Sequence, residues 1–472
     1  MWRRLLPVAV GLSLVLAACG SASVGHSSAE VGGDWTRFGY DAARHNAGPA
    51  KTGITSANVG KLRRQRVTLD GTVDASPIYL RGVKIHGASR DAFFVTTSYG
   101  RTIAVDAPSG SILWRFTPSS YSSLAGTYRI TNSTPVADPN RKFIYAASPD
   151  GRVHKLSVAS GAEARGWPVR VTLLPQREKL GTSLNYARGL VLIGTGGYVG
   201  DQPPYQGHVV AINASTGRIA HVWNSLCSNV HRLLNPSGCA HSDSAIWARS
   251  GVVVVPGSGH LLVATGNGAF DGKRNWGDSA LMLTSNAGGL LHNWTPRNQA
   301  SLESGDVDLG STAPALIGGY AVQGGKDGKL RLLNLSHLGG RLGATGGELK
   351  TVTAPPGRHE PGRRRRPALR LQRVAERLRA LDGEAARLVQ HRRLGTLEQS
   401  DRDGRPCRGA GRKRERPPDD WGSRHLSPAL TGEAPLTSQR LGVACDADLE
   451  GVRALPGRPA NPGGRTVAMK SW

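Results

Sequence analysis

The sequence predicts an all-β protein, a β-propeller of four-stranded blades, over the first 350 or so residues. Short apolar strands recur along this part, and turns rich in Gly, Asn and Ser separate them. One unit repeats: a small-residue turn, an apolar strand, a Gly turn, a second strand, and a polar-Gly turn that often leads to a Trp. Repeated units of short strands, without the period of a long helix, are typical of propeller blades.

Five copies of this unit are visible. In the first, the turn Asp74–Ile78 is followed by the strand Ala92–Thr96, the segment Gly100–Gly110 and Trp114. The copies cover residues 74–114, 133–167, 190–223, 261–294 and 312–334. We therefore expect a propeller domain at 34–350. With five copies the ring is incomplete, because an open propeller leaves a sheet edge unpaired.

The N-terminus predicts export. Met1–Arg4 is cationic, Leu5–Ala18 is apolar, and small residues precede Cys19. The apolar run is too short for a stable membrane span, which needs about 20 residues. The end of this run resembles a bacterial lipobox, so residues 1–19 are interpreted as a lipoprotein signal and 20–33 as a linker. Lipidated Cys19 would anchor the chain to the outer face of the bacterial cell membrane. An ordinary cleaved signal with a chance Cys is the alternative.

The remaining cysteines fit an exported protein. Cys227 and Cys239 lie close in sequence, and an oxidising compartment favours a disulfide between them. No Cys/His spacing indicates zinc. The formal net charge of +26 comes from basic residues scattered through the propeller region rather than gathered on one helix. We therefore expect no nucleic-acid partner, and an anionic lipid or wall polymer suits such a surface better.

The repeats resemble those of pyrroloquinoline quinone (PQQ) dehydrogenases. The entry segments Asp34–Asp41 and Ile54–Leu62 are similar to the opening of quinoprotein alcohol dehydrogenases, and the resemblance covers residues 34–340. It implies oxidation of an alcohol or sugar with PQQ and Ca²⁺. This chemistry needs an aromatic floor under a flat cofactor, a hard cation on the quinone oxygens and a carboxylate base.

Four segments match the family's site in order. The resemblance implies that Trp247 forms the floor, that Asn267 binds Ca²⁺ through its oxygen, that Asp278 is the catalytic base and a metal neighbour, and that Lys326 contacts the quinone. Each residue also has a structural interpretation. Trp247 could pack between blades, Asn267 and Lys326 could serve their turns, and Asp278 could bond a turn amide.

Three features depart from the family pattern. The family's Glu ligand for Ca²⁺ is expected at Gly194–Tyr198, but this segment contains no acidic residue. The next acidic residue along the chain is Asp201. No two Cys are adjacent, and no Cys-x-x-Cys-His motif for a c-type haem occurs. These departures favour the alternative of a non-catalytic cell-surface propeller that binds a protein or glycan, since one fold serves both kinds of function.

The tail, residues 351–472, has a different character. It contains no Phe, Tyr or Ile, and it holds 25 Lys and Arg against 14 Asp and Glu. Residues 370–390 could form a helix, and the composition of the rest predicts disorder. Codons that encode 396–409, shifted by one nucleotide, can spell a Trp blade end followed by Gly-Pro-Val-Val. We interpret the tail as out of frame from about 350–360; a true basic domain is the alternative.

Overall fold

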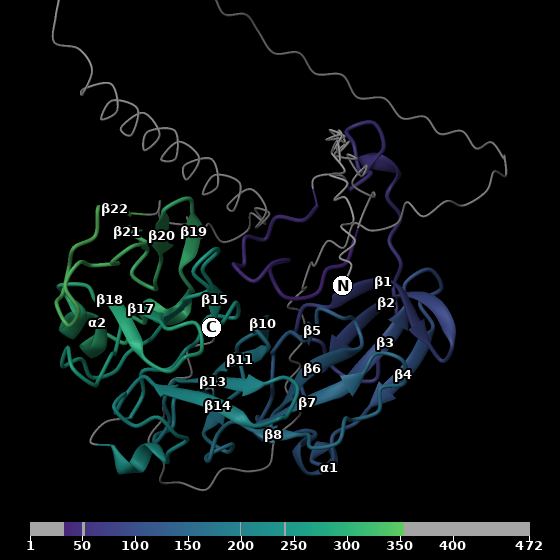
Figure 1. Cartoon of the computed structure of the whole chain (residues 1–472), viewed down its shortest axis with the longest axis horizontal. Coiled ribbons are helices and arrows are strands. Elements are labelled where there is room, and N and C mark those ends of the chain that lie inside the picture. The colour runs from purple at the N-terminus through teal and green to yellow at the C-terminus, as the bar shows by residue number, and fades with distance from the viewer. Residues whose placement is uncertain (1–32, 50–51, 199, 240–241, 354–472) are drawn as a thin grey trace, which may run out of the picture.

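A computed structural model of the chain describes residues 33–49, 52–198, 200–239 and 242–353. These residues form five antiparallel four-stranded sheets and one two-stranded sheet, β9 with β12. Figure 1 shows the large sheets one after another along an arc, from β1–β4 to β19–β22. The fold class predicted from the repeats, an all-β assembly of four-stranded blades, is confirmed.

The first two sheets consist of β1 (Ile78–Ile85), β2 (Ala88–Thr96), β3 (Thr102–Asp106), β4 (Ile112–Phe116), β5 (Val136–Ala137), β6 (Phe143–Ser148), β7 (Arg152–Ser157) and β8 (Val169–Arg170). The third sheet and the small sheet consist of β9 (Glu178–Lys179), β10 (Asn185–Ala187), β11 (Leu190–Gly194), β12 (Gly196–Gly197), β13 (His208–Asn213) and β14 (Ile219–Asn224). The last two sheets consist of β15 (Val253–Val254), β16 (Leu261–Ala264), β17 (Ala280–Leu283), β18 (Leu290–Trp294), β19 (Ala315–Ile317), β20 (Tyr320–Gln323), β21 (Lys329–Asn334) and β22 (Lys350–Thr353).

Helices are few and short in the described residues. They are α1 (Tyr121–Leu124), α2 (Gln299–Ser304) and the 3-10 turns η1 (Val59–Lys61), η2 (Pro236–Gly238) and η3 (Leu309–Ser311). None of the helices in this part of the chain has the length and apolar character needed to cross a membrane.

The hydrophobic core lies between successive sheets. Four apolar clusters each join strands of two neighbouring sheets, for example Tyr145 of β6 with Val210 of β13, and Trp223 of β14 with Leu281 of β17. The central strands are therefore covered on both faces, and all four residues of β17 are buried. This explains why these strands are continuously apolar instead of alternating apolar and polar residues.

A glycine turn fixes the contact between neighbouring sheets. Trp114 of β4 packs on the turn after β7, where Gly161 has a φ of +73°. A Cβ atom at Gly161 would lie 2.6 Å from Cε3 of the indole. The indole Nε1 donates a hydrogen bond of 2.9 Å to the carbonyl of Val158 in the same turn. Only glycine permits both the backbone conformation and this approach.

Some details differ from the sequence-based expectation. The third and fourth large sheets begin with β10 and β15, which precede the copies predicted at 190–223 and 261–294, and the last sheet continues past residue 350 to Thr353. Cys227 and Cys239 form the expected disulfide, with their Cα atoms 6.2 Å apart. The predictions for Cys19, for the signal and linker, and for the tail after Thr353 lie outside the described residues.

We predict that Gly161→Ala destabilises the protein much more than Gly189→Ala. Both glycines have positive φ, at +73° and +77°, but a Cβ atom at Gly189 would meet nothing within 4 Å. Gly189→Ala therefore carries only the conformational cost, about 1–2 kcal/mol, whereas Gly161→Ala adds overpacking against Trp114, about 1–3 kcal/mol. Urea unfolding measures both, and equal losses in the two variants would contradict the proposed contact.

Candidate functional site

The four predicted site residues lie on loops of the last two large sheets. Trp247 precedes β15, Asn267 follows β16, Asp278 precedes β17, and Lys326 lies in the turn between β20 and β21. The ends of β16 and β17 are held together by the pair Ala264 and Ala280. The antiparallel register therefore brings Asn267 and Asp278 side by side.

Asp308 connects this group, and the sequence analysis did not identify it. Its Oδ1 accepts hydrogen bonds from Nε1 of Trp247 at 3.1 Å and from the backbone N–H of Asn267 at 2.9 Å. Its Oδ2 forms an ion pair with Nζ of Lys326. The charge and hydrogen bond of Asp308 outweigh the effect of burial and raise the pKa of Lys326. One carboxylate thus links three of the four predicted residues.

Asn267 presents an oxygen without a partner. Its Nδ2 donates to the carbonyl of Leu302 at 2.8 Å and lies 3.4 Å from Oδ2 of Asp278. Its Oδ1 is buried and makes no hydrogen bond among the described residues. Leaving a buried acceptor unpaired costs about 1–3 kcal/mol, so this oxygen is a candidate ligand for a cation.

Asp278 is a buried carboxyl group. Asp278 is fully buried, and its backbone has a φ of +45°. Its Oδ1 accepts a hydrogen bond of 3.0 Å from the backbone N–H of Leu309. Burial, together with the charges of Asp308 and Glu303, raises the pKa of Asp278 to about 7. A carboxyl group in this range exchanges protons near neutral pH.

The indole of Trp247 rests on a glycine surface. Cβ atoms at Gly196 and Gly197 would approach its ring to 3.2 and 3.0 Å, and a Cβ atom at Gly266 would overlap Oδ1 of Asp308. Tyr205 flanks the ring, with the two centroids 6.0 Å apart. These glycines therefore bring the backbone close enough to the indole to hold the ring in place.

The surroundings of the site are acidic. Burial and the charges of Glu303, Asp201 and Asp308 raise the pKa of Asp243 to about 6. Burial and the charges of Asp308 and Asp306 likewise raise the pKa of Asp201. This concentration of carboxylates contrasts with the basic chain as a whole, and Lys326 is the basic residue that meets it through Asp306 and Asp308. The site therefore favours a bound cation.

An acid does lie beside the segment Gly194–Tyr198, but it comes from another strand. Glu178 of β9 pairs with Gly197 of β12 and is fully buried. Its Oε1 bonds Nε2 of His208 at 2.9 Å and accepts the backbone N–H of Gln206 at 3.1 Å. Burial disfavours the protonated form of His208, but the charge and hydrogen bond of Glu178 outweigh this effect and raise the pKa of His208. Glu178 therefore neutralises a buried histidine. No three His, Cys, Asp or Glu side chains form a ready metal cluster within the described ranges.

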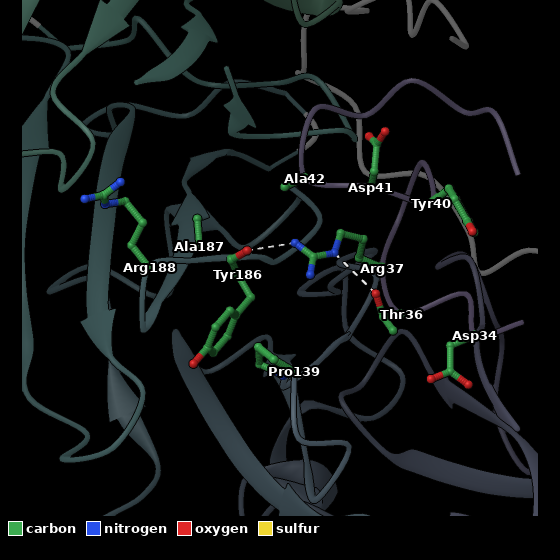
Figure 2. A pocket seen from close by; sticks show the side chains of 10 residues that line it. All are labelled: Asp34, Thr36, Arg37, Tyr40, Asp41, Ala42, Pro139, Tyr186, Ala187 and Arg188. Atoms are coloured by element: carbon green, nitrogen blue, oxygen red, sulfur yellow. Dashed lines mark hydrogen bonds between the residues drawn. The ribbon is translucent and has the colours of Figure 1, made fainter. Parts of the chain in front are cut away.

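A separate cavity of about 530 Å³ lies beside the N-terminal segment. Figure 2 shows Arg37 reaching from this segment towards Tyr186. Nη1 of Arg37 donates to the Tyr186 carbonyl at 2.7 Å and to Oδ1 of Asn185 at 2.9 Å. None of the four predicted site residues lines this cavity. Arg37 uses its hydrogen bonds to hold the entry segment against β10. Because the predicted site residues gather around Asp308 instead, we place the candidate functional site there.

Comparison with known proteins identifies the repeats. A family described as outer membrane protein assembly factor BamB matches residues 72–225. Quinohemoprotein alcohol dehydrogenase ADH IIB of Pseudomonas putida is 27% identical over 226 residues, 46% of this chain and 29% of the relative. The dehydrogenase subunit of the quinone alcohol dehydrogenase of Gluconobacter oxydans (strain 621H) is 26% identical over 245 residues, 48% and 30% of the two chains. The repeats of this chain are thus similar to those of the β-propellers of PQQ-dependent dehydrogenases.

Solved structures support this fold. The quinohemoprotein alcohol dehydrogenase of Comamonas testosteroni superposes with a TM-score of 0.52 at 19% identity, over 68% of this chain and 49% of the other. A europium-containing methanol dehydrogenase superposes with a TM-score of 0.51 at 17% identity, over 65% and 57%. The matched part of this chain covers less than a third of the length of each of the two dehydrogenases named above. It covers about half the length of each of the two solved structures.

We predict that Asp278→Asn changes how stability depends on pH. The folded-state pKa of about 7 exceeds that of an unfolded carboxyl group, about 3.9. The folded state therefore binds the proton more tightly than the unfolded state. The resulting stabilisation of the folded state is full below about pH 4 and is lost as pH rises through 7. A difference of one pH unit between the folded and unfolded pKa corresponds to about 1.4 kcal/mol. The variant should gain roughly 1–3 kcal/mol over the wild type between pH 4.5 and 8, measured by urea unfolding.

Asp271→Asn is the matched control, with the opposite sign. Hydrogen bonds from the backbone N–H groups of Arg274, Asn275 and Lys273 outweigh burial and lower the pKa of Asp271. The Asp271 carboxylate therefore stabilises the folded state at neutral pH, and this stabilisation is lost as pH falls through its folded-state pKa. Parallel pH profiles for the wild type and Asp278→Asn would show that Asp278 is not held protonated.

Proposed function

We propose that the intact protein is an exported quinoprotein that binds PQQ and a hard cation at Asp308 and oxidises an alcohol or sugar. The observation that carries the proposal is the unpaired Oδ1 of Asn267, buried beside Asp278 and next to an indole held on glycines. The quinone would supply the two-electron oxidation, and the chain's own residues bind and orient the reactants.

The aromatic requirement is met by Trp247. Its ring edge is fixed by the hydrogen bond to Asp308, and Gly196 and Gly197 support the ring. A flat ring system gains dispersion and stacking energy from such a surface, about 0.5–1.5 kcal/mol beyond the buried area. Trp247 is half-buried, unlike the fully buried Trp223 and Trp294 that pack between sheets. This difference supports a ligand-binding role rather than a packing role.

The cation requirement is met by oxygen donors. Oδ1 of Asn267 and Oδ2 of Asp278 are the nearest candidate ligands, and Asp308 and Glu303 add negative charge. Amide and carboxylate oxygens suit Ca²⁺. One structural neighbour is a europium-containing methanol dehydrogenase, so a trivalent cation is also considered. The residues present therefore fit a cation on the cofactor.

Proton transfer and orientation fall to two side chains. A pKa of about 7 suits Asp278 to accept the substrate proton at neutral pH, as the resemblance implies. Lys326 points its ammonium group at Asp308 and Asp306, at 3.6 Å from the latter. From there Lys326 would contact the quinone, as the resemblance implies.

A non-catalytic scaffold is the second candidate. The BamB family matches residues 72–225, which contain none of the four site residues. The carboxylate of Glu178 is bonded to His208, so the family's acidic ligand is missing from the Asp308 group. Such a propeller would bind a protein or glycan at the cell surface.

The anchor and the tail complete the proposal. Lipidation of Cys19 would hold the propeller on the outer face of the membrane, where Cys227 and Cys239 can oxidise. Residues 351–472 lack the aromatic and β-branched content of further blades, which supports a frameshift near 350–360.

We predict that PQQ quenches tryptophan emission of the full chain only when Ca²⁺ or Eu³⁺ is present. Trp247→Leu and Asn267→Ala should each weaken PQQ binding by about tenfold or more, which corresponds to roughly 1.4 kcal/mol. Asn213→Ala is the control, because Asn213 lies in a comparable turn and its Oδ1 is satisfied by Ser215 and Thr216. Sensitised Eu³⁺ emission reports cation binding without turnover.

The same titration is repeated on the protein translated with its reading frame restored. Binding by neither protein would overturn the cofactor proposal and leave the scaffold as the function. Equal affinity in Asn267→Ala and Asn213→Ala would reduce Asn267 to a turn residue.

A further inference from the structure

The cavity beside the N-terminal segment lies at the other end of the strands from the Asp308 group. Two of its walls are turns between the first and second strands of a sheet: Pro139 lies between β5 and β6, and Arg188 between β10 and β11. Asn267 and Lys326 instead lie between second and third strands. The sheets repeat one unit, and successive turns of an antiparallel sheet alternate between its two ends. The cavity, about 530 Å³ in volume, is therefore a separate place of a size that holds small ligands.

Arg37 presents a free donor to this cavity. Its Nη1 donates to Oδ1 of Asn185 and to the carbonyl of Tyr186, and its Nε donates to Oγ1 of Thr36 at 3.4 Å. Nη2 makes no hydrogen bond among the described residues. Figure 2 shows this third nitrogen directed towards the space between Tyr186 and Thr36. A guanidinium donor in such a position is available to an anion.

A second guanidinium group lies behind the first. Arg44 is only 6% exposed, and it donates to the carbonyls of Phe38, Ser183 and Leu184. Burial and, to a smaller extent, the charge of Arg37 lower the pKa of Arg44 to about 9, and burial also lowers the pKa of Arg37. All the hydrogen bonds of both arginines go to uncharged acceptors. Since buried charges are normally paired, this pair of cations lacks a counter-charge.

The two carboxylates in the cavity wall are engaged elsewhere. Asp34 forms an ion pair of 2.8 Å with Nε of Arg141. Asp41 accepts the backbone N–H of His45 at 3.1 Å and is bonded to Nδ1 of its ring at 2.6 Å. Figure 2 shows both carboxylates directed away from the guanidinium group of Arg37. The charge of Asp41 raises the pKa of Arg37 but does not overcome the effect of burial. The cavity therefore favours an anionic ligand.

The rest of the wall suits a ligand body with both apolar and hydroxyl groups. Tyr40 and Tyr186 supply two rings, and Ala42, Ala187 and Pro139 supply apolar surface. A tyrosine offers an apolar face together with a hydroxyl group that forms hydrogen bonds. A sugar ring has the matching combination of C–H faces and hydroxyl groups.

We propose that this cavity binds an acidic sugar, with the carboxylate or phosphate of the sugar on Nη2 of Arg37 and its ring against the two tyrosines. For an exported propeller with a basic surface, such a ligand is a unit of an anionic polymer of the cell envelope. The site gives the glycan-binding candidate function a surface and a ligand class. It does not depend on a bound cofactor.

Calorimetric titration of the full chain with glucuronate, glucose-6-phosphate, glucose and acetate tests the proposal. Both charged sugars should bind at least about tenfold more tightly than glucose or acetate. Added NaCl should weaken their binding, because salt screens partly exposed charges. The tighter of the two charged sugars identifies the preferred anionic group. Equal affinity for glucose and glucuronate would overturn the anionic site, equal affinity for acetate and glucuronate would overturn the sugar, and binding of none would overturn both.

Two variants locate the site. Arg37→Gln should weaken glucuronate binding by at least about tenfold. Arg129→Gln is the matched control, because Arg129 also donates to backbone carbonyls, those of Pro149 and Pro175, but does not line the cavity. Arg37 also holds the N-terminal segment, so Ala187→Leu, which fills the cavity and removes no hydrogen bond, should weaken binding as well. Wild-type affinity in either folded cavity variant would overturn the proposal.

A further comparison separates this site from the proposed cofactor site. Trp247→Leu changes the other end of the strands and should bind glucuronate with wild-type affinity, whether or not the full chain binds PQQ. Arg37→Gln should likewise leave any binding of PQQ unchanged. Loss of glucuronate binding in Trp247→Leu would place the sugar at the Asp308 group and overturn the second site.

Discussion

Each four-stranded sheet of this chain can bury its apolar faces only against the sheets before and after it. The four hydrophobic clusters therefore lie between sheets rather than within them. This constraint explains the continuously apolar central strands, such as β16 and β17, and the tryptophans that end on a neighbour's turn. It also explains why such a turn carries a glycine: the backbone has a positive φ, and the neighbour's indole occupies the space of a side chain. Stability in such an array is a sum over neighbouring contacts.

The candidate site follows from the same constraint. Asn267 and Asp278 come from one sheet, Lys326 comes from the next, and Asp308 lies on the connection between the two sheets. A close backbone approach holds these loops together. Cβ atoms at Gly277 and Gly310 would overlap the backbone of Gly268 and of Thr265. The loops therefore cannot separate without breaking the seam, which keeps polar groups at fixed distances in a partly buried place.

The sequence predicted the fold better than the site. Repeats, strand periodicity and turn glycines are local features, and they identified the five large sheets. The disulfide partners were also found, because Cys227 and Cys239 lie near each other in sequence. Strands without the signature were missed, since β10 and β15 follow no Ser-Pro turn and β22 contains no Trp. The resemblance named four residues that the structure brings together. It did not identify Asp308, whose importance depends on contacts 61 and 41 residues away in sequence. The sequence feature that could have identified Asp308 is the pair of acidic residues Asp306 and Asp308 shortly before the fifth copy.

The position of the site makes it sensitive to the state of the ring. One wall, with Lys326, belongs to the sheet β19–β22, and that sheet is covered on one side only, as the half-buried Leu330 and Leu332 show. A terminal repeat is stabilised by one interface instead of two, so it opens locally at a lower free energy than an internal repeat. Opening of this sheet would displace Lys326 relative to Trp247, because the Trp247 loop precedes β15 of the neighbouring sheet. Covering the outer face of β19–β22 would therefore order the site as well as the fold.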